Sequence, residues 1–91
     1  MLQLNTKFEL GRIVATPSIV ELFSQAEIEG AITRHSQGDW GDLSTNDVRE
    51  NELALVAGNR LLSAYRHDHG TMWVITEGDG STTTLLLPDE Y

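Results

Sequence analysis

Apolar residues along this chain follow two spacings, a helical one in the first two thirds and a strand-like one in the last third. They recur every three or four positions over residues 17–26, over residues 29–36 and between Ser44 and Gly58. Such spacing gathers apolar side chains on one face of a helix. The pattern therefore predicts three helices, each with one face directed toward a core.

Capping signals mark the ends of these helices. Thr16 is a suitable N-cap, and Pro17 occupies the first helical position, where its missing N–H breaks no hydrogen bond. Ser44 and Asp47 have the spacing of a capping box, with Asp in place of the usual Glu or Gln. Gly58 stands where glycine commonly ends a helix. These signals define the start of the first helix and both ends of the third.

Runs rich in β-branched residues predict strands before and after the helices. Four runs have this character, at residues 7–16, 61–66, 71–77 and 81–87. Two short turns connect the last three runs as an antiparallel meander, His67-Asp68-His69-Gly70 and Gly78-Asp79-Gly80. We therefore expect a single α+β domain over residues 1–91, in the order β-α-α-α-β-β-β. Its helices would pack on one face of a three- to four-stranded antiparallel sheet.

The charge of the chain restricts the partners that it can have. Its 14 acidic and 6 basic residues give a net charge of −8. Binding to the phosphates of a nucleic acid requires a basic surface, so we expect no direct contact with DNA or RNA. An acidic surface suits a basic protein, including one whose nucleic-acid groove it would occupy. The simpler interpretation is that the charge maintains solubility.

The composition also bears on location and on reactive groups. The chain has no cysteine, which excludes disulfides, thiolate metal sites and a cysteine nucleophile. Residues 1–5 lack the basic and apolar regions of a signal peptide, and no apolar run is long enough to span a bilayer. We therefore expect a soluble, cytoplasmic protein that does not bind membranes.

Three histidines are the first candidates for chemistry. His67 and His69 would share a metal ion if both pointed the same way, but they fall in a predicted turn and the spacing supplies no third ligand. His35 lies near Asp39, which could orient it as a general base. It could equally stabilise the end of its helix. We therefore expect no metal ion and no cofactor.

The most distinctive local sequence is Gly38-Asp39-Trp40-Gly41-Asp42. Trp40 could be an exposed anchor for a partner, because tryptophan is enriched at interface hot spots. Alternatively, it could fold back over the small core with its indole N–H bonded to a loop carbonyl. Acidic residues of this loop and of later segments could form one face for a basic protein. The candidate partner-binding residues are Asp39, Trp40, Asp42, Glu50, Glu77 and Asp79.

Several segments between residues 11 and 91 form a recognisable combination. They are Gly11-Arg12-Ile13-Val14-Ala15-Thr16-Pro17, Arg34-His35-x-x-Gly38-Asp39-Trp40-Gly41-Asp42, Asn51-Glu52-x-Ala54-Leu55, Gly58-x-Arg60-Leu61-Leu62-Ser63-Ala64-Tyr65, Trp73-Val74-Ile75-Thr76-Glu77 and Thr83-Thr84-x-Leu86-Leu87-Pro88-x-Glu90-Tyr91. Together they resemble a family of small bacterial proteins described as plasmid-related proteins, found on plasmids, integrated elements and phages and generally without assigned function. The resemblance implies a mobile-element setting. The family has a plain Asp-Gly turn where this chain has two histidines.

The order of helices and meander is also similar to the barnase, RelE and EndoU class of small ribonucleases. That resemblance implies a metal-independent ribonuclease in which His35 acts as acid or base and arginines bind phosphate. Its residues would be His35, Arg60, Tyr65, Arg66 and Thr84. The negative charge opposes this interpretation, as does a meander of three strands where the class has four.

Three functions thus remain open. The favoured one is a small, acidic, non-enzymatic interaction module of a mobile element that binds a host or defence protein with a basic surface. An anti-CRISPR or anti-restriction inhibitor would have this form, and it predicts a contiguous acidic face. The ribonuclease predicts that its histidine and arginines converge in one cleft. A dimerising accessory domain, the third function, predicts an exposed sheet face that pairs with a second copy.

Overall fold

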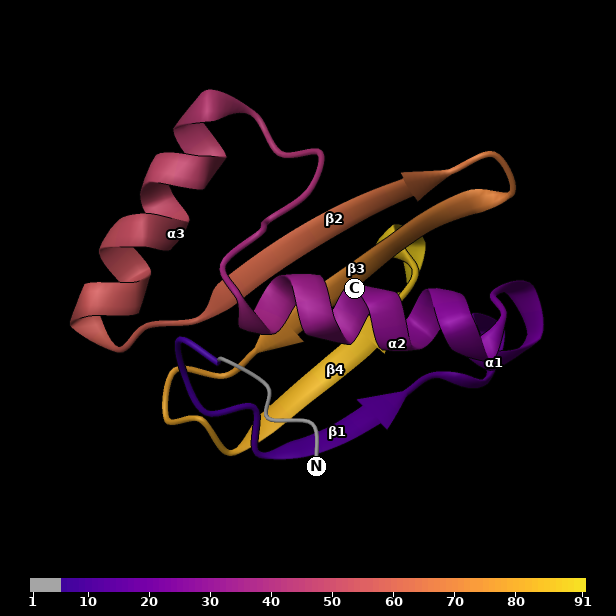
Figure 1. Ribbon diagram of the computed structural model, residues 1–91, viewed down its shortest axis with the longest axis horizontal. Helices are drawn as coiled ribbons and strands as arrows, with labels where there is room; N and C mark the ends of the chain where they lie inside the picture. Colours follow the sequence, from indigo (N-terminus) through magenta and orange to yellow (C-terminus); the bar gives the residue numbers. More distant parts are fainter. Residues whose placement is uncertain (1–5) are drawn as a thin grey trace.

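The computed structural model describes residues 6–91, which form three helices and a four-stranded mixed sheet (Figure 1). Residues 1–5, the N-terminal segment considered above, lie outside the described residues. The α+β class is confirmed, and the predicted order β-α-α-α-β-β-β is followed by a 3-10 helix that the sequence did not indicate. The elements are β1 (Arg12–Ala15), α1 (Pro17–Leu22), α2 (Gln25–Ser36), α3 (Thr45–Ala57), β2 (Leu61–His67), β3 (Gly70–Thr76), β4 (Thr82–Leu86) and the 3-10 helix η1 (Pro88–Glu90).

The sheet has the strand order β1-β4-β3-β2. β2, β3 and β4 form the expected antiparallel meander. β1 runs parallel to β4, with Ile13 beside Thr83, so the expectation of a purely antiparallel sheet is wrong. The reason is that β1 and β4 are separated by all three helices and by the other two strands. The side-chain pattern that predicts a strand gives no direction to such a distant pairing.

The first two helices divide at a different place from the one that the sequence predicts. α1 ends at Leu22 and α2 begins at Gln25, so residues 23–26 are not the end of one helix. The cause is a capping box, in which Ser24 Oγ accepts the Glu27 N–H at 3.1 Å and Glu27 Oε1 accepts the Ser24 N–H at 2.9 Å. None of the helices in residues 6–91 has the length and apolar character that crossing a bilayer requires.

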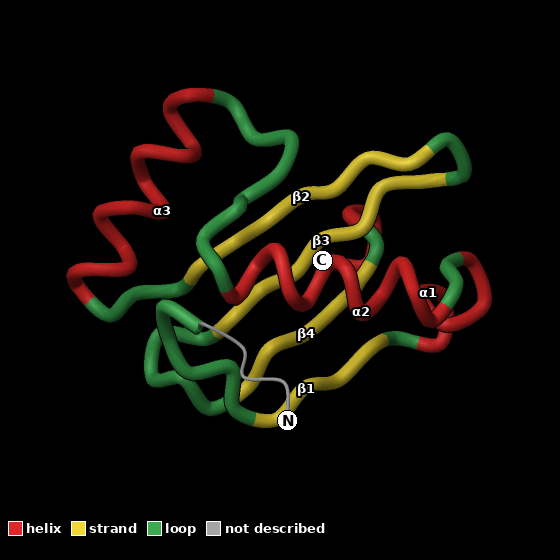
Figure 2. Tube along the Cα trace, in the orientation of Figure 1, coloured by secondary structure: helices red, strands yellow, loops and turns green. Residues whose placement is uncertain are grey.

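α1 and α2 cover one face of the sheet (Figure 2). The buried side chains of Ile19, Phe23 and Ala31 pack there against residues of all three meander strands, such as Met72 and Leu85. The described residues extend 35 × 34 × 19 Å, and the short dimension reflects one layer of helices on one sheet. This packing confirms the expected layers for α1 and α2.

α3 lies beside the free edge of β2 instead of across the face of the sheet (Figure 1). Its Asn51 side chain donates to the Leu62 carbonyl at 2.5 Å and accepts the Leu62 N–H at 3.1 Å. Farther along the same edge, Ala64 donates to the Trp40 carbonyl at 3.1 Å and accepts the Asp42 N–H at 2.7 Å. An edge strand presents unpaired backbone groups, and these contacts satisfy those of Leu62 and Ala64.

Candidate functional site

A pocket of about 220 Å³ opens between the C-terminal half of α3, the β3–β4 turn and the segment that precedes β1. Its apolar lining residues include Phe8, Leu55 and Leu61, and its acidic lining residues are Glu9, Glu77 and Asp79. No lysine, arginine or histidine stands among the described residues that line it. We call it the acidic pocket. It combines apolar contact area with three carboxylates.

The β3–β4 turn holds two of these acids in place. Glu77 follows β3 directly, and its N–H donates to the Thr82 carbonyl at 3.0 Å, which continues the strand pairing into the turn. Asp79 Oδ1 accepts the Ser81 N–H at 3.0 Å. Hydrogen bonds from Ser81 lower the pKa of Asp79 below its usual value, so this carboxylate stays ionised at neutral pH. The turn therefore presents fixed negative charge at the pocket.

One cation lies near the acidic pocket without lining it. Arg60 NH2 is 3.4 Å from Glu77 Oε1, and about half of each side chain is exposed. The other end of the guanidinium donates to the Tyr91 hydroxyl at 2.6 Å. An exposed pair of this length contributes little free energy and is screened by salt. Glu77 therefore remains able to bind a second cation.

The outward side of α3 continues this surface. Leu53 and Val56 are 60% and 90% exposed, an unusual state for large apolar side chains. A second hollow is lined by Glu50, Leu53 and Arg60, and it shares Ala54 and Asn59 with the acidic pocket. The outer face of α3, defined by Glu50, Leu53 and Val56, thus adjoins the acidic pocket through Glu50 and Leu53, whereas Val56 lines neither hollow.

Two of the predicted partner-binding acids form side-chain hydrogen bonds that stabilise the loop between α2 and α3. Asp39 accepts two hydrogen bonds from the Arg34 guanidinium, at 2.7 and 3.1 Å. These bonds hold the pKa of Asp39 below its usual value. Asp42 Oδ2 accepts the Arg66 N–H at 2.8 Å. Neither acid lines the acidic pocket. Of the six predicted partner-binding residues, only Glu77 and Asp79 lie together at this pocket.

Of the two interpretations that the sequence leaves open for Trp40, the exposed anchor is the wrong one. The side chain is 4% exposed and stacks on Phe8, with 6.0 Å between ring centroids. Its indole Nε1 donates to Glu52 Oε2 at 2.6 Å. The alternative interpretation, that Trp40 folds back over the small core, is confirmed, although its acceptor is a side-chain carboxylate and not a loop carbonyl. Burial of a large aromatic ring is the stronger driving force in so small a domain.

His35 is fully buried between α2 and the sheet. Its Nδ1 lies 2.5 Å from Ser63 Oγ and its Nε2 lies 2.9 Å from Thr76 Oγ1. Burial lowers the pKa of His35 from the ordinary 6.5 to about 4. Asp39, the partner expected from the sequence, pairs with Arg34 instead. His35 is therefore a neutral structural group with no exposed surface for proton transfer to a substrate.

The other residues named for a ribonuclease do not gather around His35. Arg60 precedes β2 and Arg66 lies near its end, so the two are roughly 20 Å apart along an extended strand. The Tyr65 hydroxyl donates to the Asp39 carbonyl at 2.6 Å, and burial raises the pKa of Tyr65 to about 12. Thr84 alternates with the buried Thr83 and so points to the opposite face of the sheet. The structure forms no common cleft from these five residues.

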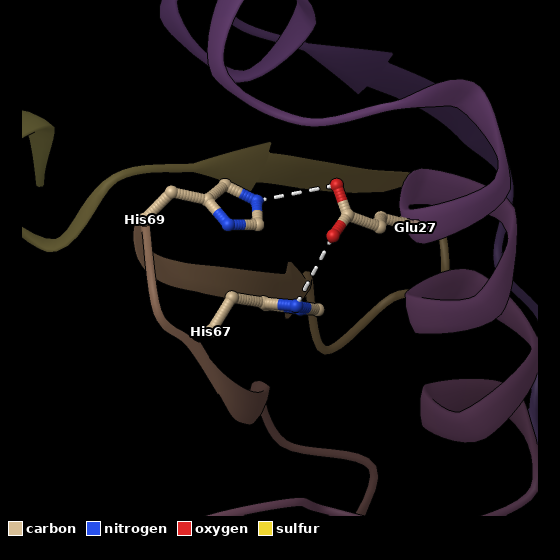
Figure 3. Close-up of side chains that lie close together, drawn as sticks. All are labelled: Glu27, His67 and His69. Atoms are coloured by element: carbon tan, nitrogen blue, oxygen red, sulfur yellow. Dashed lines mark hydrogen bonds and ion pairs between the residues drawn. The ribbon is translucent and has the colours of Figure 1, made fainter.

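A third ligand for His67 and His69, which the sequence did not supply, comes from α2 (Figure 3). Glu27 points toward both imidazoles, and the possible ligand atoms of the three side chains lie within 4.8 Å of one another. Glu27 is 40 residues away from the nearer histidine, which is why spacing could not reveal it. Among residues 6–91, this is the one group of this kind that could hold a metal ion.

Comparisons of the chain with models of protein families, with curated proteins and with solved structures find no match. The resemblance to plasmid-related proteins therefore stays a prediction. The support for the candidate residues therefore comes from the geometry of the structure and not from related proteins. Glu9 is the pocket residue that sequence reasoning missed, because it reaches the pocket only through long-range contacts such as the bond from Thr83 to the Leu10 carbonyl.

Proposed function

We propose that this protein is an acidic, non-enzymatic module that binds a basic protein, with the acidic pocket receiving a lysine or arginine side chain of the partner. The observation that carries the proposal is the pocket itself, whose lining combines Glu9, Glu77 and Asp79 with apolar residues. Lysine and arginine pack their aliphatic stems on apolar surface while their charged heads pair with carboxylates. The pocket offers both features in one place.

The negative charge of the surface is mostly left without a local cation. The chain has 14 acidic and 6 basic residues, and within residues 6–91 only Arg34 and Arg60 among the lysines and arginines form ion pairs. Such a surface attracts a basic partner over distance and speeds its association. This attraction supports a charged partner but does not by itself select a site. The pocket supplies the site.

The outer face of α3 supplies the apolar part of the same interface. Leu53 and Val56 are exposed on α3, whose C-terminal half lines the pocket, and the core of a protein–protein interface is commonly more apolar than its rim. Glu50 adds an acid on the same side of the helix. The partner would thus contact an apolar stripe on α3 and insert a cationic side chain beside it.

The resemblance described above motivates the cellular setting. In that setting the protein is cytoplasmic and encoded by a mobile element, and its partner is a host or defence protein that handles nucleic acid. Occupying the basic groove of such a protein would inhibit it, as an anti-CRISPR or anti-restriction protein does. The identity of the partner and the position of the binding site are independent, and one binding experiment distinguishes them.

Isothermal titration calorimetry against purified basic proteins of CRISPR and restriction systems tests the binding. The pocket variant carries Glu9→Lys, Glu77→Lys and Asp79→Lys. The matched control carries Glu21→Lys, Glu29→Lys and Asp89→Lys, which are exposed acids outside the pocket. Both have a net charge of −2, because three replacements of an acid by lysine add six charges to −8.

We expect the pocket variant to lose about tenfold or more in affinity and the control to stay within a few fold of the wild type. Binding of the wild type should weaken with added salt. Equal losses in both variants would show that only net charge matters, which is the solubility interpretation. Binding that requires the pocket but involves basic proteins outside defence systems would keep the module and reject the setting.

A further inference from the structure

Two imidazoles and one carboxylate converge where the β2–β3 hairpin meets the start of α2 (Figure 3). His67 Nδ1 lies 3.5 Å from Glu27 Oε2, and His69 Nε2 lies 3.2 Å from Glu27 Oε1. We propose that Glu27, His67 and His69 bind a divalent first-row transition metal ion, for which Zn²⁺ is the first probe. This metal site lies on different elements from the acidic pocket and is independent of the proposed function.

The ligand types and their separations suit such an ion. Imidazole nitrogen and carboxylate oxygen bind Zn²⁺ at about 2.0–2.2 Å, which places the ligand atoms of a tetrahedral site about 3.3 Å apart. Glu27 Oε2, the oxygen that the Ser24 N–H leaves free, lies 3.5 Å from His67 Nδ1, close to that separation, and His69 Nε2 lies 3.2 Å from the other oxygen of the same carboxylate. Small rotations of the three side chains would therefore admit the ion. Carboxylate and imidazole ligands without sulfur fit Zn²⁺, Co²⁺ and Ni²⁺.

Neighbouring groups hold the three side chains in position. The Phe23 ring packs against both imidazoles, with centroid distances of 5.2 Å to His67 and 5.0 Å to His69. Glu27 Oε1 also accepts the Ser24 N–H at 2.9 Å, the bond that caps α2. That bond leaves Oε2 available as a ligand and orients the carboxylate, as outer hydrogen bonds do in known metal sites. The site is thus preorganised by a helix cap and an aromatic ring.

The tip of the β2–β3 hairpin packs against the end of α1. A Cβ at Gly70 would lie 2.8 Å from Leu22 Cδ2, so a larger residue there would have to displace the end of the Leu22 side chain. The hairpin tip and the end of α1 are thus in close contact. This contact brings His67 and His69 to Glu27, which lies in the first turn of α2.

Three protein ligands leave a fourth position for water, which is typical of an open zinc site. Glu27 and His67 also line a hollow of about 140 Å³, together with Ala31, Arg34 and Tyr65. This hollow gives solvent and small ligands access to the metal site. The simpler interpretation is an ion pair between Glu27 and protonated histidines, which requires no metal ion.

Calorimetry and native mass spectrometry of the untagged, chelator-treated chain with Zn²⁺ distinguish the two interpretations. We expect one Zn²⁺ per chain, and with Co²⁺ the visible absorption of a four-coordinate ion. Glu27→Gln retains an acceptor for the Ser24 N–H and so preserves the helix cap, but it removes the anionic ligand. Glu29→Gln is the matched control, because Glu29 is exposed on the same helix and is not part of the metal site.

We expect Glu27→Gln to weaken Zn²⁺ binding about tenfold or more, and the double variant His67→Ala, His69→Ala to abolish it. Glu29→Gln should bind as the wild type does. Circular dichroism establishes that each variant is folded. Failure of the wild type to take up Zn²⁺ at millimolar concentration, or equal affinity in the wild type and the folded double-histidine variant, would overturn the proposal.

Discussion

Nε2 of His35 lies 2.9 Å from Oγ1 of Thr76 in the interior, and this pair belongs to a directed chain of hydrogen bonds. Thr83 Oγ1 donates to the Leu10 carbonyl at 2.7 Å, so its oxygen accepts from Thr76, also at 2.7 Å. Thr76 must then accept from the Nε2–H of His35, and Nδ1 accepts from the Ser63 hydroxyl. A neutral imidazole with its proton on Nε2 gives every group in this series of hydrogen bonds a partner.

The buried histidine makes stability depend on pH. Burial lowers the pKa of His35 from 6.5 to about 4, so the unfolded chain gains a proton near pH 6.5 while the folded chain stays neutral until about pH 4. The stabilisation is therefore complete above pH 6.5 and is lost as the pH falls toward 4. The loss amounts to about 3 kcal/mol in the free energy of unfolding. Urea denaturation across this range measures it.

The control is His35→Gln, which has no group that titrates in this range. The difference in unfolding free energy between the wild type and His35→Gln should narrow as the pH falls from 7 to 4. Carboxylates with lowered pKa values, such as Asp39, affect both proteins alike and cancel. A difference that stays constant over this range would contradict the neutral, buried imidazole.

The second prediction concerns the bond between Trp40 and Glu52. Trp40→Phe keeps an aromatic ring against Phe8 but removes the N–H that donates to Glu52 at 2.6 Å. We expect it to lower the free energy of unfolding by about 1–2 kcal/mol, as hydrogen bonds to charged groups do. Glu52→Gln keeps an acceptor and should cost less than half as much. Equal stability of Trp40→Phe and the wild type in chemical denaturation would refute this role.

The third prediction concerns the attachment of α3 to the sheet. Asn51→Ala removes both hydrogen bonds to the backbone of Leu62, which leaves two groups of the β2 edge without partners. We expect a loss of about 2–3 kcal/mol in stability, and faster hydrogen exchange at the Leu62 amide. Asn46→Ala, at an exposed position of the same helix, is the control and should change neither quantity appreciably.

The fourth prediction concerns two glycines whose replacement by alanine should change the stability of the fold in opposite directions. Gly41 has a positive φ of 76°, and a Cβ there would overlap the Ala64 carbonyl, so Gly41→Ala should destabilise the fold by about 2 kcal/mol or more. Gly30 lies inside α2 with open space around it. Gly30→Ala should stabilise the fold by about 0.5–1 kcal/mol. Thermal unfolding of both variants checks the pair, and destabilisation by Gly30→Ala would contradict the prediction, because a Cβ at this position meets no neighbouring atom.

The local sequence predicted those parts of the fold that local signals determine. The Ser44 cap and Gly58 termination of α3 and the three hairpin-linked strands were predicted because each depends on neighbouring residues. The parallel pairing of β1 with β4 was not, because it depends on contacts between distant segments. The division between α1 and α2 was a missed local signal, since Ser24 and Glu27 have the spacing of a capping box.

The same distinction, between what neighbouring residues determine and what distant contacts determine, applies to the candidate sites. Glu77 and Asp79 are among the acids that the sequence offers as candidates, and the β3–β4 turn holds them close together, whereas Glu9 joins them only through the tertiary fold. His67 and His69 were noticed as neighbours in sequence, but the carboxylate of Glu27 comes from another element. Spacing along a chain identifies ligands on one element. It carries no information about which separate elements the fold brings together.

The fifth prediction concerns the cation beside the acidic pocket. Arg60→Gln removes the competitor that lies 3.4 Å from Glu77, so a basic partner should bind several-fold more tightly. Arg66→Gln changes the net charge equally, but Arg66 is exposed near the other end of β2 and does not line the pocket, so this variant should have the smaller effect. Calorimetry at low salt compares the two variants. Equal effects would mean that the pocket has no special affinity for cations.

The most direct test of the acidic pocket is an NMR titration of the ¹⁵N-labelled chain with a blocked tetra-arginine peptide. The predicted result is that amide shifts concentrate at Glu9, Glu77, Asp79 and Gly80. They should disappear in the pocket triple variant and persist in the control triple variant of equal net charge. A titration in which shifts spread evenly over the exposed acids, or in which both variants respond alike, would contradict the account, because the charge would then act without a site.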